Sequence, residues 1–165
     1  MECCAGGFHP STRQTTKERD DARAVDQCEQ GSEIEEWKMI PKYIEQFKQA
    51  DTEIRSAFSA SHPDGYKEIL TEVVKHLEGL DHKRVHEIDD GNYQGTLVYV
   101  IGETGYQPSE YVTARVSYGS CSACDTFESI RNYTDDAPSQ KQVNNYMTLA
   151  LHMVESMWPI DGSIA

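Results

Sequence analysis

The fold of this chain is decided by residues 84–118, which read RVHEIDDGNYQGTLVYVIGETGYQPSEYVTARVSY. Apolar and polar residues alternate through much of this stretch, and Thr, Val and Tyr are abundant, as they are in strands with one buried face. Asp89-Asp90-Gly91-Asn92 is a strong turn signal, and residues 102–110 contain the Gly, Pro and Ser of a loop. The stretch predicts three strands, 84–89, 93–101 and 111–118, in an antiparallel meander.

Helical periodicity precedes these strands. Apolar residues recur at three- and four-residue steps from Pro41 to Ala57 and again from Tyr66 to Leu80, which predicts two helices with one apolar face each. Residues 62–65, His-Pro-Asp-Gly, separate the two helices because Pro and Gly interrupt helical structure.

Helical periodicity returns after the strands. A short helix is expected from Gly119 onward. A last helix is expected from Gln140 to Met157, with Ser139 as its N-cap and Gln142 as the capping-box partner. Together these elements indicate an α+β fold, a central three-stranded antiparallel sheet flanked by N-terminal and C-terminal helices.

A length of 165 residues suits one domain. Residues 1–32 are polar and contain almost no bulky apolar side chains, which is the composition of a disordered acidic and polar tail. We therefore place a single α+β domain at residues 33–158 and a short C-terminal tail at residues 159–165.

The chain is acidic, with 15 Lys and Arg against 28 Asp and Glu and a net charge of −13. From residue 86 onward three basic residues stand against eleven acidic ones, a net of −8. Such a field disfavours nucleic acid, whose phosphates are bound mainly by Lys and Arg. It either favours a basic protein partner or simply keeps the domain soluble, and solubility is the simpler interpretation. No apolar run approaches the roughly 20 residues of a membrane span. The N-terminus lacks a secretory signal pattern, so a cytoplasmic location is expected.

The chemically unusual segment is residues 118–125, Tyr-Gly-Ser-Cys-Ser-Ala-Cys-Asp, where a strand meets a helix. Ser120 or Cys121 would be the N-cap, and the partial positive charge of a helix N-terminus lowers the pKa of a thiol. Cys121 and Cys124 are three residues apart, so on a helix they would share one face and could hold a metal or form a disulfide.

Two functional interpretations of the cysteine pair stay open. A strand, Cys-x-x-Cys and a helix in this order are typical of a thiol redox site, although no parallel strand–helix–strand pattern precedes them. Zinc needs four ligands, and His82 and His86 could supply two beside Cys121 and Cys124. An iron–sulfur cluster would normally need four cysteines, and the other three lie in the tail. The sequence therefore predicts no cofactor, and zinc is the one that these four side chains could hold.

A structural interpretation is the simpler alternative. Helical phase turns Cys124 toward Phe127 in the core and leaves Cys121 as an exposed cap, because a free cysteine behaves as a small apolar residue.

Carboxylates are expected to gather near the ends of the strands, where they could bind a divalent cation or transfer protons. Hairpin formation and a favourable charge in the first turn of a helix explain several of them equally well. The residues concerned are Glu87, Asp89, Asp90, Glu103 and Asp125.

Residues 89–96, Asp-Asp-Gly-Asn-Tyr-Gln-Gly-Thr, residues 118–125 and the helix around residues 146–151 together resemble small, uncharacterised proteins of tailed bacteriophages. The resemblance covers roughly residues 64–157 and implies a phage-encoded protein that acts in the host cytoplasm. It implies no activity, and His82 and His86 are outside its pattern.

The sequence thus favours a phage-type accessory protein, a non-catalytic domain that binds a host or phage protein. The alternative is a metal-binding or thiol-redox site, which could be enzymatic, built on Cys121 and Cys124. The expected binding surface comprises Tyr118, Gly119, Ser120, Cys121, Asp125 and Asp90.

Overall fold

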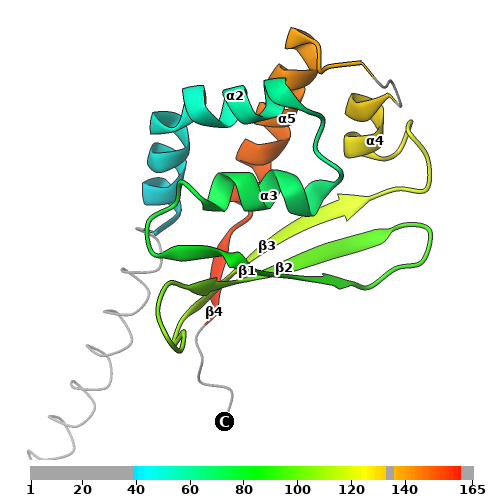
Figure 1. Cartoon of the computed structure of the whole chain (residues 1–165). Helices are drawn as coiled ribbons and strands as arrows, with labels where there is room; N and C mark the ends of the chain where they lie inside the picture. Colours follow the sequence, from blue (N-terminus) through cyan, green and yellow to red (C-terminus); the bar gives the residue numbers. More distant parts are fainter. Residues whose placement is uncertain (1–38, 133–135, 161–165) are drawn as a thin grey trace, which may run out of the picture. The chain divides into compact units, whose positions relative to one another are not determined.

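The computed structural model of this chain describes residues 39–132 and 136–160 (Figure 1). Helices together with an antiparallel sheet confirm the predicted α+β class. The tail predicted at residues 1–32 lies outside the described residues. Residues 39–49 are helical, and the elements that follow are α2 (Asp51–Ala60), α3 (Tyr66–Val74), β1 (Leu80–Asp89), β2 (Gly95–Glu103), β3 (Tyr111–Tyr118), α4 (Thr126–Arg131), α5 (Gln140–Glu155) and β4 (Trp158–Ile160).

The sheet has four strands in the order β1-β2-β3-β4, and every neighbouring pair is antiparallel. The prediction of three strands is therefore wrong. The additional strand β4 pairs with β3, placing Trp158 opposite Thr113. A strand of three residues is too short to show alternation in the sequence, and Pro159 is tolerated because β4 is an edge strand. Pro159 and Ile160 belong to this strand and not to the C-terminal tail that the sequence predicts from residue 159.

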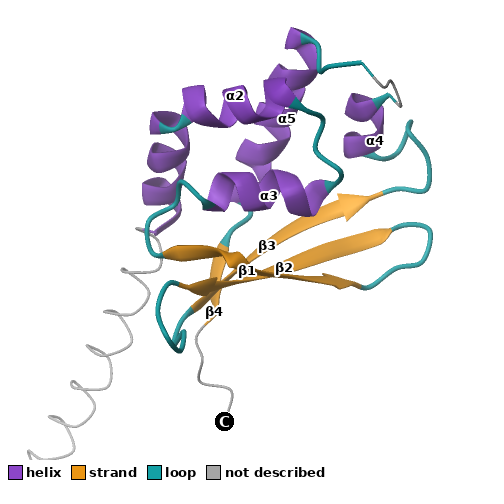
Figure 2. Cartoon of the chain, in the orientation of Figure 1, coloured by secondary structure: helices purple, strands orange, loops and turns teal. Residues whose placement is uncertain are grey.

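The described helices lie on one side of the sheet (Figure 2). Tyr99 of β2 is paired with Ala114 of β3, and Ile101 with Val112, and all four side chains are buried. They belong to one core with apolar side chains of the helices, such as Val154. Burial of one such aliphatic or aromatic side chain contributes about 1.5–3 kcal/mol, so this core is what holds the helices on the sheet.

The helices differ from prediction at their ends. The single helix expected from Pro41 to Ala57 is two, because the backbone of Ala50 (φ −90°, ψ 12°) leaves helical geometry before α2 begins. The second helix, expected to reach Leu80, ends at Val74. Gly79 has a φ of +92°, a conformation that glycine adopts readily, and Leu80 beyond it begins β1.

The remaining boundaries are closer to expectation. β3 spans the predicted residues, whereas β1 and β2 extend further at the ends away from the turn that joins them, and β2 begins at Gly95 instead of Tyr93. The capping box of α5 is confirmed: the Ser139 hydroxyl accepts a hydrogen bond from the Gln142 backbone N–H, and the Gln142 side chain accepts one from the Ser139 N–H.

Candidate functional site

The two cysteines lie in an exposed turn that joins β3 to α4. The Cys121 carbonyl accepts hydrogen bonds from the backbone N–H groups of Cys124 and Asp125, both at 2.8 Å. Both thiols are free and exposed, and the two Sγ atoms are 2.8 Å apart. The turn therefore presents a close dithiol to solvent.

Asp125 holds this turn in place through hydrogen bonds made in the interior of the domain. It is 4% exposed and is the N-cap of α4, accepting a hydrogen bond from the Glu128 N–H at 2.8 Å. The hydroxyl of Tyr66, on α3, donates to the same oxygen at 3.0 Å, and the N–H of Gly119 donates to the other oxygen at 3.1 Å. One buried carboxylate thus joins the end of β3, the start of α4 and the start of α3.

Gly119 is required by close packing. A Cβ atom at this position would lie 2.5 Å from the Cys124 carbonyl oxygen and 2.7 Å from its Sγ. Two of the atoms that it would meet belong to the Cys124 backbone, so no side-chain rotation relieves the clash. Only glycine lets the cysteine turn fold back this closely over the end of the strand.

The thiol of Cys121 is a candidate nucleophile, because its pKa is lowered. Its hydrogen bond with the Cys124 thiol, followed by the backbone N–H groups of Ala123 and Cys124, lowers the pKa of Cys121. Such donors favour the thiolate form, which is the nucleophile in thiol chemistry.

Two expectations about this segment are wrong. The N-cap is Asp125, not Ser120 or Cys121, because α4 begins only at Thr126. Asp is among the strongest N-cap residues, and here its carboxylate also accepts hydrogen bonds from the Gly119 N–H and the Tyr66 hydroxyl. Since the cysteines precede the helix, helical phase does not apply to them, and Cys124 is exposed instead of packed in the core.

The residues expected to form a binding surface gather at one end of the sheet. Tyr118 of β3 is paired with Gly95, the first residue of β2, and its hydroxyl donates a hydrogen bond to Asp89 at 2.8 Å. Asp90 follows Asp89 in the turn between β1 and β2. Ser120 and Cys121 are exposed beside them, whereas Asp125 is buried and supports the surface from within.

The histidines of the predicted zinc set are not brought to the cysteines. His86 lies on β1, paired with Val100, and β2 separates β1 from β3. Among the described residues no group of three or more His, Cys, Asp or Glu side chains is arranged to hold a metal ion. The set of His82, His86, Cys121 and Cys124 is thus not assembled there.

The roles of two tyrosines were not predictable from the sequence, where Tyr66 is one residue of an apolar helix face and Tyr99 one residue of a strand. Burial, followed by the charge of Asp125, raises the pKa of Tyr66 to about 12, although backbone N–H groups of α4 act in the opposite direction. Burial and then the carboxylate of Glu87 raise the pKa of Tyr99 as well. A tyrosine at the start of an apolar helix face was the one signal in the sequence for Tyr66.

In the part of the chain that the structure describes, no helix combines the length and the apolar character needed to cross a membrane. The sequence matches no protein-family model, and it has no significant match among curated proteins or solved structures.

Proposed function

We propose that this chain performs thiol–disulfide exchange at Cys121 and Cys124, with Cys121 as the attacking thiolate and Cys124 as the resolving thiol. The observation that carries the proposal is the 2.8 Å separation of two exposed Sγ atoms. The lowered pKa of Cys121 gives it the attacking role, because a lower pKa increases the fraction of thiolate, which is the nucleophilic form.

The sulfur geometry favours a disulfide over a metal site. Two thiolates on one zinc ion, each about 2.3 Å from the metal in a tetrahedral site, are roughly 3.8 Å apart. A disulfide bond is about 2.05 Å long. The observed 2.8 Å lies below the zinc spacing, and less than an ångström of movement would close the bond.

The exchange has two balanced steps. The Cys121 thiolate attacks one sulfur of a partner's disulfide, forming a mixed disulfide and releasing the second partner sulfur as a thiolate, which takes up a proton. Cys124 then gives up its proton and attacks the Cys121 sulfur, which releases the first partner sulfur. The chain ends as a Cys121–Cys124 disulfide, and the partner is reduced to a dithiol. The reverse sequence oxidises a partner.

The experiment uses the full chain with Cys3, Cys4 and Cys28 replaced by Ser, so that only the described pair reports. The protein is equilibrated in glutathione buffers of graded potential, and the loss of two hydrogens is followed by intact mass spectrometry. We expect one two-electron transition with a defined midpoint. A pair that stays reduced across the whole series, or stoichiometric zinc in native mass spectra of protein purified without chelator, would contradict the proposal.

Partner binding is a second function that one observation supports. Tyr93 lies in the turn between β1 and β2 and is 83% exposed, at the end of the sheet that also holds the cysteine turn. Exposed aromatic side chains are common anchors of protein interfaces. The interaction role and phage-type origin expected from the sequence stay proposals of this kind, with a host or phage protein as the partner.

A trapping experiment separates docking from chemistry. A Cys124→Ser variant, in the background without tail cysteines, should retain partners as mixed disulfides on Cys121. Adding Tyr93→Ser should lower the yield of trapped protein while leaving the reaction of Cys121 with oxidised glutathione unchanged. Equal trapping by both variants would exclude Tyr93 from the docking surface.

A further inference from the structure

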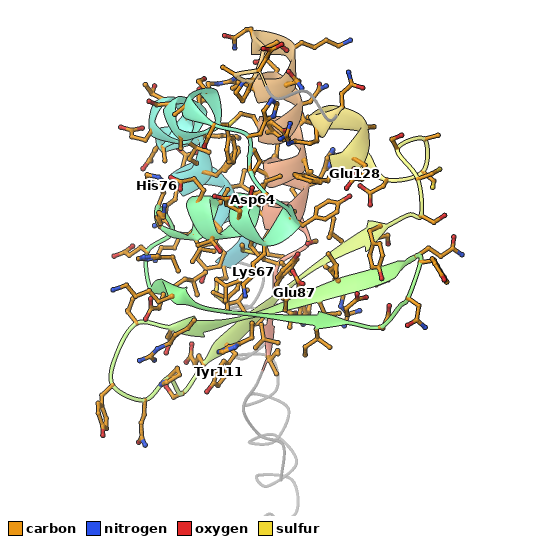
Figure 3. The ribbon with its side chains drawn as sticks, turned by 45° about the vertical axis from the view of Figure 1, so that its right-hand side comes forward. Asp64, Lys67, His76, Glu87, Tyr111 and Glu128 are labelled. Atoms are coloured by element: carbon orange, nitrogen blue, oxygen red, sulfur yellow. The ribbon has the colours of Figure 1, made fainter. Side chains whose placement is uncertain are left out.

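At the end of β1 the polar side chains face the helices and the apolar one faces away, which is the opposite of a strand that covers a core. Val85 faces the helices and is buried, so Glu87 and Asp89, two and four residues further along, face the same side. Ile88, between them, faces away from the helices and is 54% exposed. Glu87 is paired with the buried Tyr99 (Figure 3 labels Glu87 on β1). Two carboxylates thus occupy positions at which apolar side chains would stabilise the fold.

A buried hydroxyl points into this acidic pair. Tyr99 is fully buried and its phenol oxygen has no hydrogen-bond partner within the described structure. Burial and then the interaction with the Glu87 carboxylate raise the pKa of Tyr99, with smaller contributions from Tyr66 and Asp89, so its hydroxyl end lies near Glu87. A buried polar group without a partner costs free energy, so the fold retains one here without stabilising benefit.

Among the side chains that the structure describes, the acidic pair has no basic counterpart. No Lys, Arg or His of the described residues forms an ion pair with Glu87 or Asp89. Lys67 on α3 is exposed and forms none with them. The other contacts of Asp89 are the Tyr118 hydroxyl and the backbone N–H of Gly91. Net negative charge at this place is therefore left for a ligand to balance.

We propose that Glu87, Asp89 and the Tyr99 hydroxyl form a binding site for the guanidinium group of an arginine side chain presented by a partner protein. Two residues along a strand separate the carboxylates by about 6.5 Å at the backbone, a spacing that suits a planar fork with five N–H donors. A compact ammonium has three donors and spans less.

The phenol oxygen would accept a third hydrogen bond once the exposed Glu87 carboxylate turns toward the ligand. A divalent cation fits less well, because no third carboxylate, histidine or cysteine completes a metal set among the described residues. The site is independent of the thiol chemistry, since none of its three groups touches a cysteine in the hydrogen bonds of this region.

The test is an NMR titration of the ¹⁵N-labelled full chain with Nα-acetyl-arginine amide at constant ionic strength. The neutral isostere Nα-acetyl-citrulline amide is titrated in parallel. We expect saturable shifts of the β1 and β2 amides around Glu87 and Tyr99 with a dissociation constant on the order of 1 mM, as for one charge-assisted contact. Citrulline should produce none.

Isosteric variants give the matched comparison. Glu87→Gln should weaken arginine binding at least tenfold, and Tyr99→Phe about threefold to tenfold, as expected for loss of one hydrogen bond. Glu53→Gln removes the same charge from an exposed position on α2 and should leave the affinity unchanged. Circular dichroism confirms that each variant is folded.

Three outcomes would overturn the proposal. Citrulline could shift the same amides to the same extent, Glu53→Gln could weaken binding as much as Glu87→Gln, or Mg²⁺ could saturate the same amides more tightly than arginine does. The last result would assign the site to a divalent cation. All of these readouts are made on the reduced chain, so they are insensitive to whether the cysteines exchange disulfides.

Discussion

Replacement of Asp125 tests whether one buried carboxylate holds the cysteine turn in place. Asp125→Asn keeps the shape of the side chain and a carbonyl oxygen that can still cap α4, because Asn is as good an N-cap as Asp. What it loses is the second oxygen, which accepts from the Gly119 N–H at 3.1 Å. An amide NH₂ would face that N–H instead, so two donors would meet.

The magnitude follows from the contacts. An unpaired buried N–H costs about 1–3 kcal/mol, so Asp125→Asn should destabilise the chain by about 2 kcal/mol. Asp125→Ala removes the cap as well, about 1 kcal/mol, and leaves the Tyr66 hydroxyl without its acceptor, for a total of about 4 kcal/mol. Tyr66→Phe should cost about 2 kcal/mol, because that hydroxyl also accepts from the Phe127 N–H at 3.0 Å.

The assay is urea unfolding followed by circular dichroism, with midpoints compared at a common m-value. Asp125→Ala and Tyr66→Phe share one hydrogen bond, so their double variant should be less destabilised than the sum of the singles by about 1 kcal/mol. Strict additivity would refute the reasoning, and so would an Asn variant as unstable as the Ala variant. The first result would mean that the two groups are not coupled, and the second that the contact with Gly119 accounts for the whole loss, so that the cap of α4 and the Tyr66 hydroxyl add nothing.

Three further predictions concern the Cys121 thiol, Gly119 and the Tyr99 hydroxyl. Without tail cysteines, the pH at which Cys121 alkylates at half its maximal rate should lie below the roughly 8.5 of a free cysteine, because its pKa is lowered, and Cys124→Ala should raise it again; an unchanged midpoint would exclude the sulfur–sulfur hydrogen bond as the cause. Gly119→Ala should lower stability by about 2 kcal/mol or more in urea unfolding, whereas Gly65→Ala, whose added Cβ meets nothing within 4 Å, should cost far less. Tyr99→Phe should raise stability by about 1 kcal/mol, because it removes a buried hydroxyl without a partner; a loss would show that the hydroxyl is satisfied in solution.

The sheet was predictable wherever alternation ran over enough residues. β3 combines alternation with Thr, Val and Tyr, and its predicted bounds agree with the structure. β4 was not predictable, because three residues that follow a long helix carry no periodic signal and owe their extended form to pairing with β3. The break at Ala50 was missed for a similar reason, since the apolar stripe continues from Phe47 to Ile54 on either side of it.

The two cysteines were enough to locate the site in the sequence, but the geometry of their turn could not be predicted. Extrapolating helical phase back from Phe127 placed Cys124 in the core, whereas α4 begins after Asp125 and the cysteines belong to a turn. Sequence alone could not show that Gly119 leaves room for that turn, because the clash depends on atoms brought together by folding. The inward orientation of Glu87 was equally hidden, since the register of β1 shifts between Leu80 and Val85.

Gln142 gives the cysteine segment a second anchor. Besides completing the capping box of α5, its side-chain amide donates to the carbonyl oxygens of Ile130 and Arg131, at the end of α4. The segment from Gly119 to Arg131 is therefore fastened at its start by Asp125 and at its end by α5. A change in the bonding of Cys121 and Cys124 would then be confined to their own turn. A partner would therefore distinguish the reduced from the oxidised pair only by binding at the two sulfur atoms, because the conformation of distant surfaces would be the same in both states.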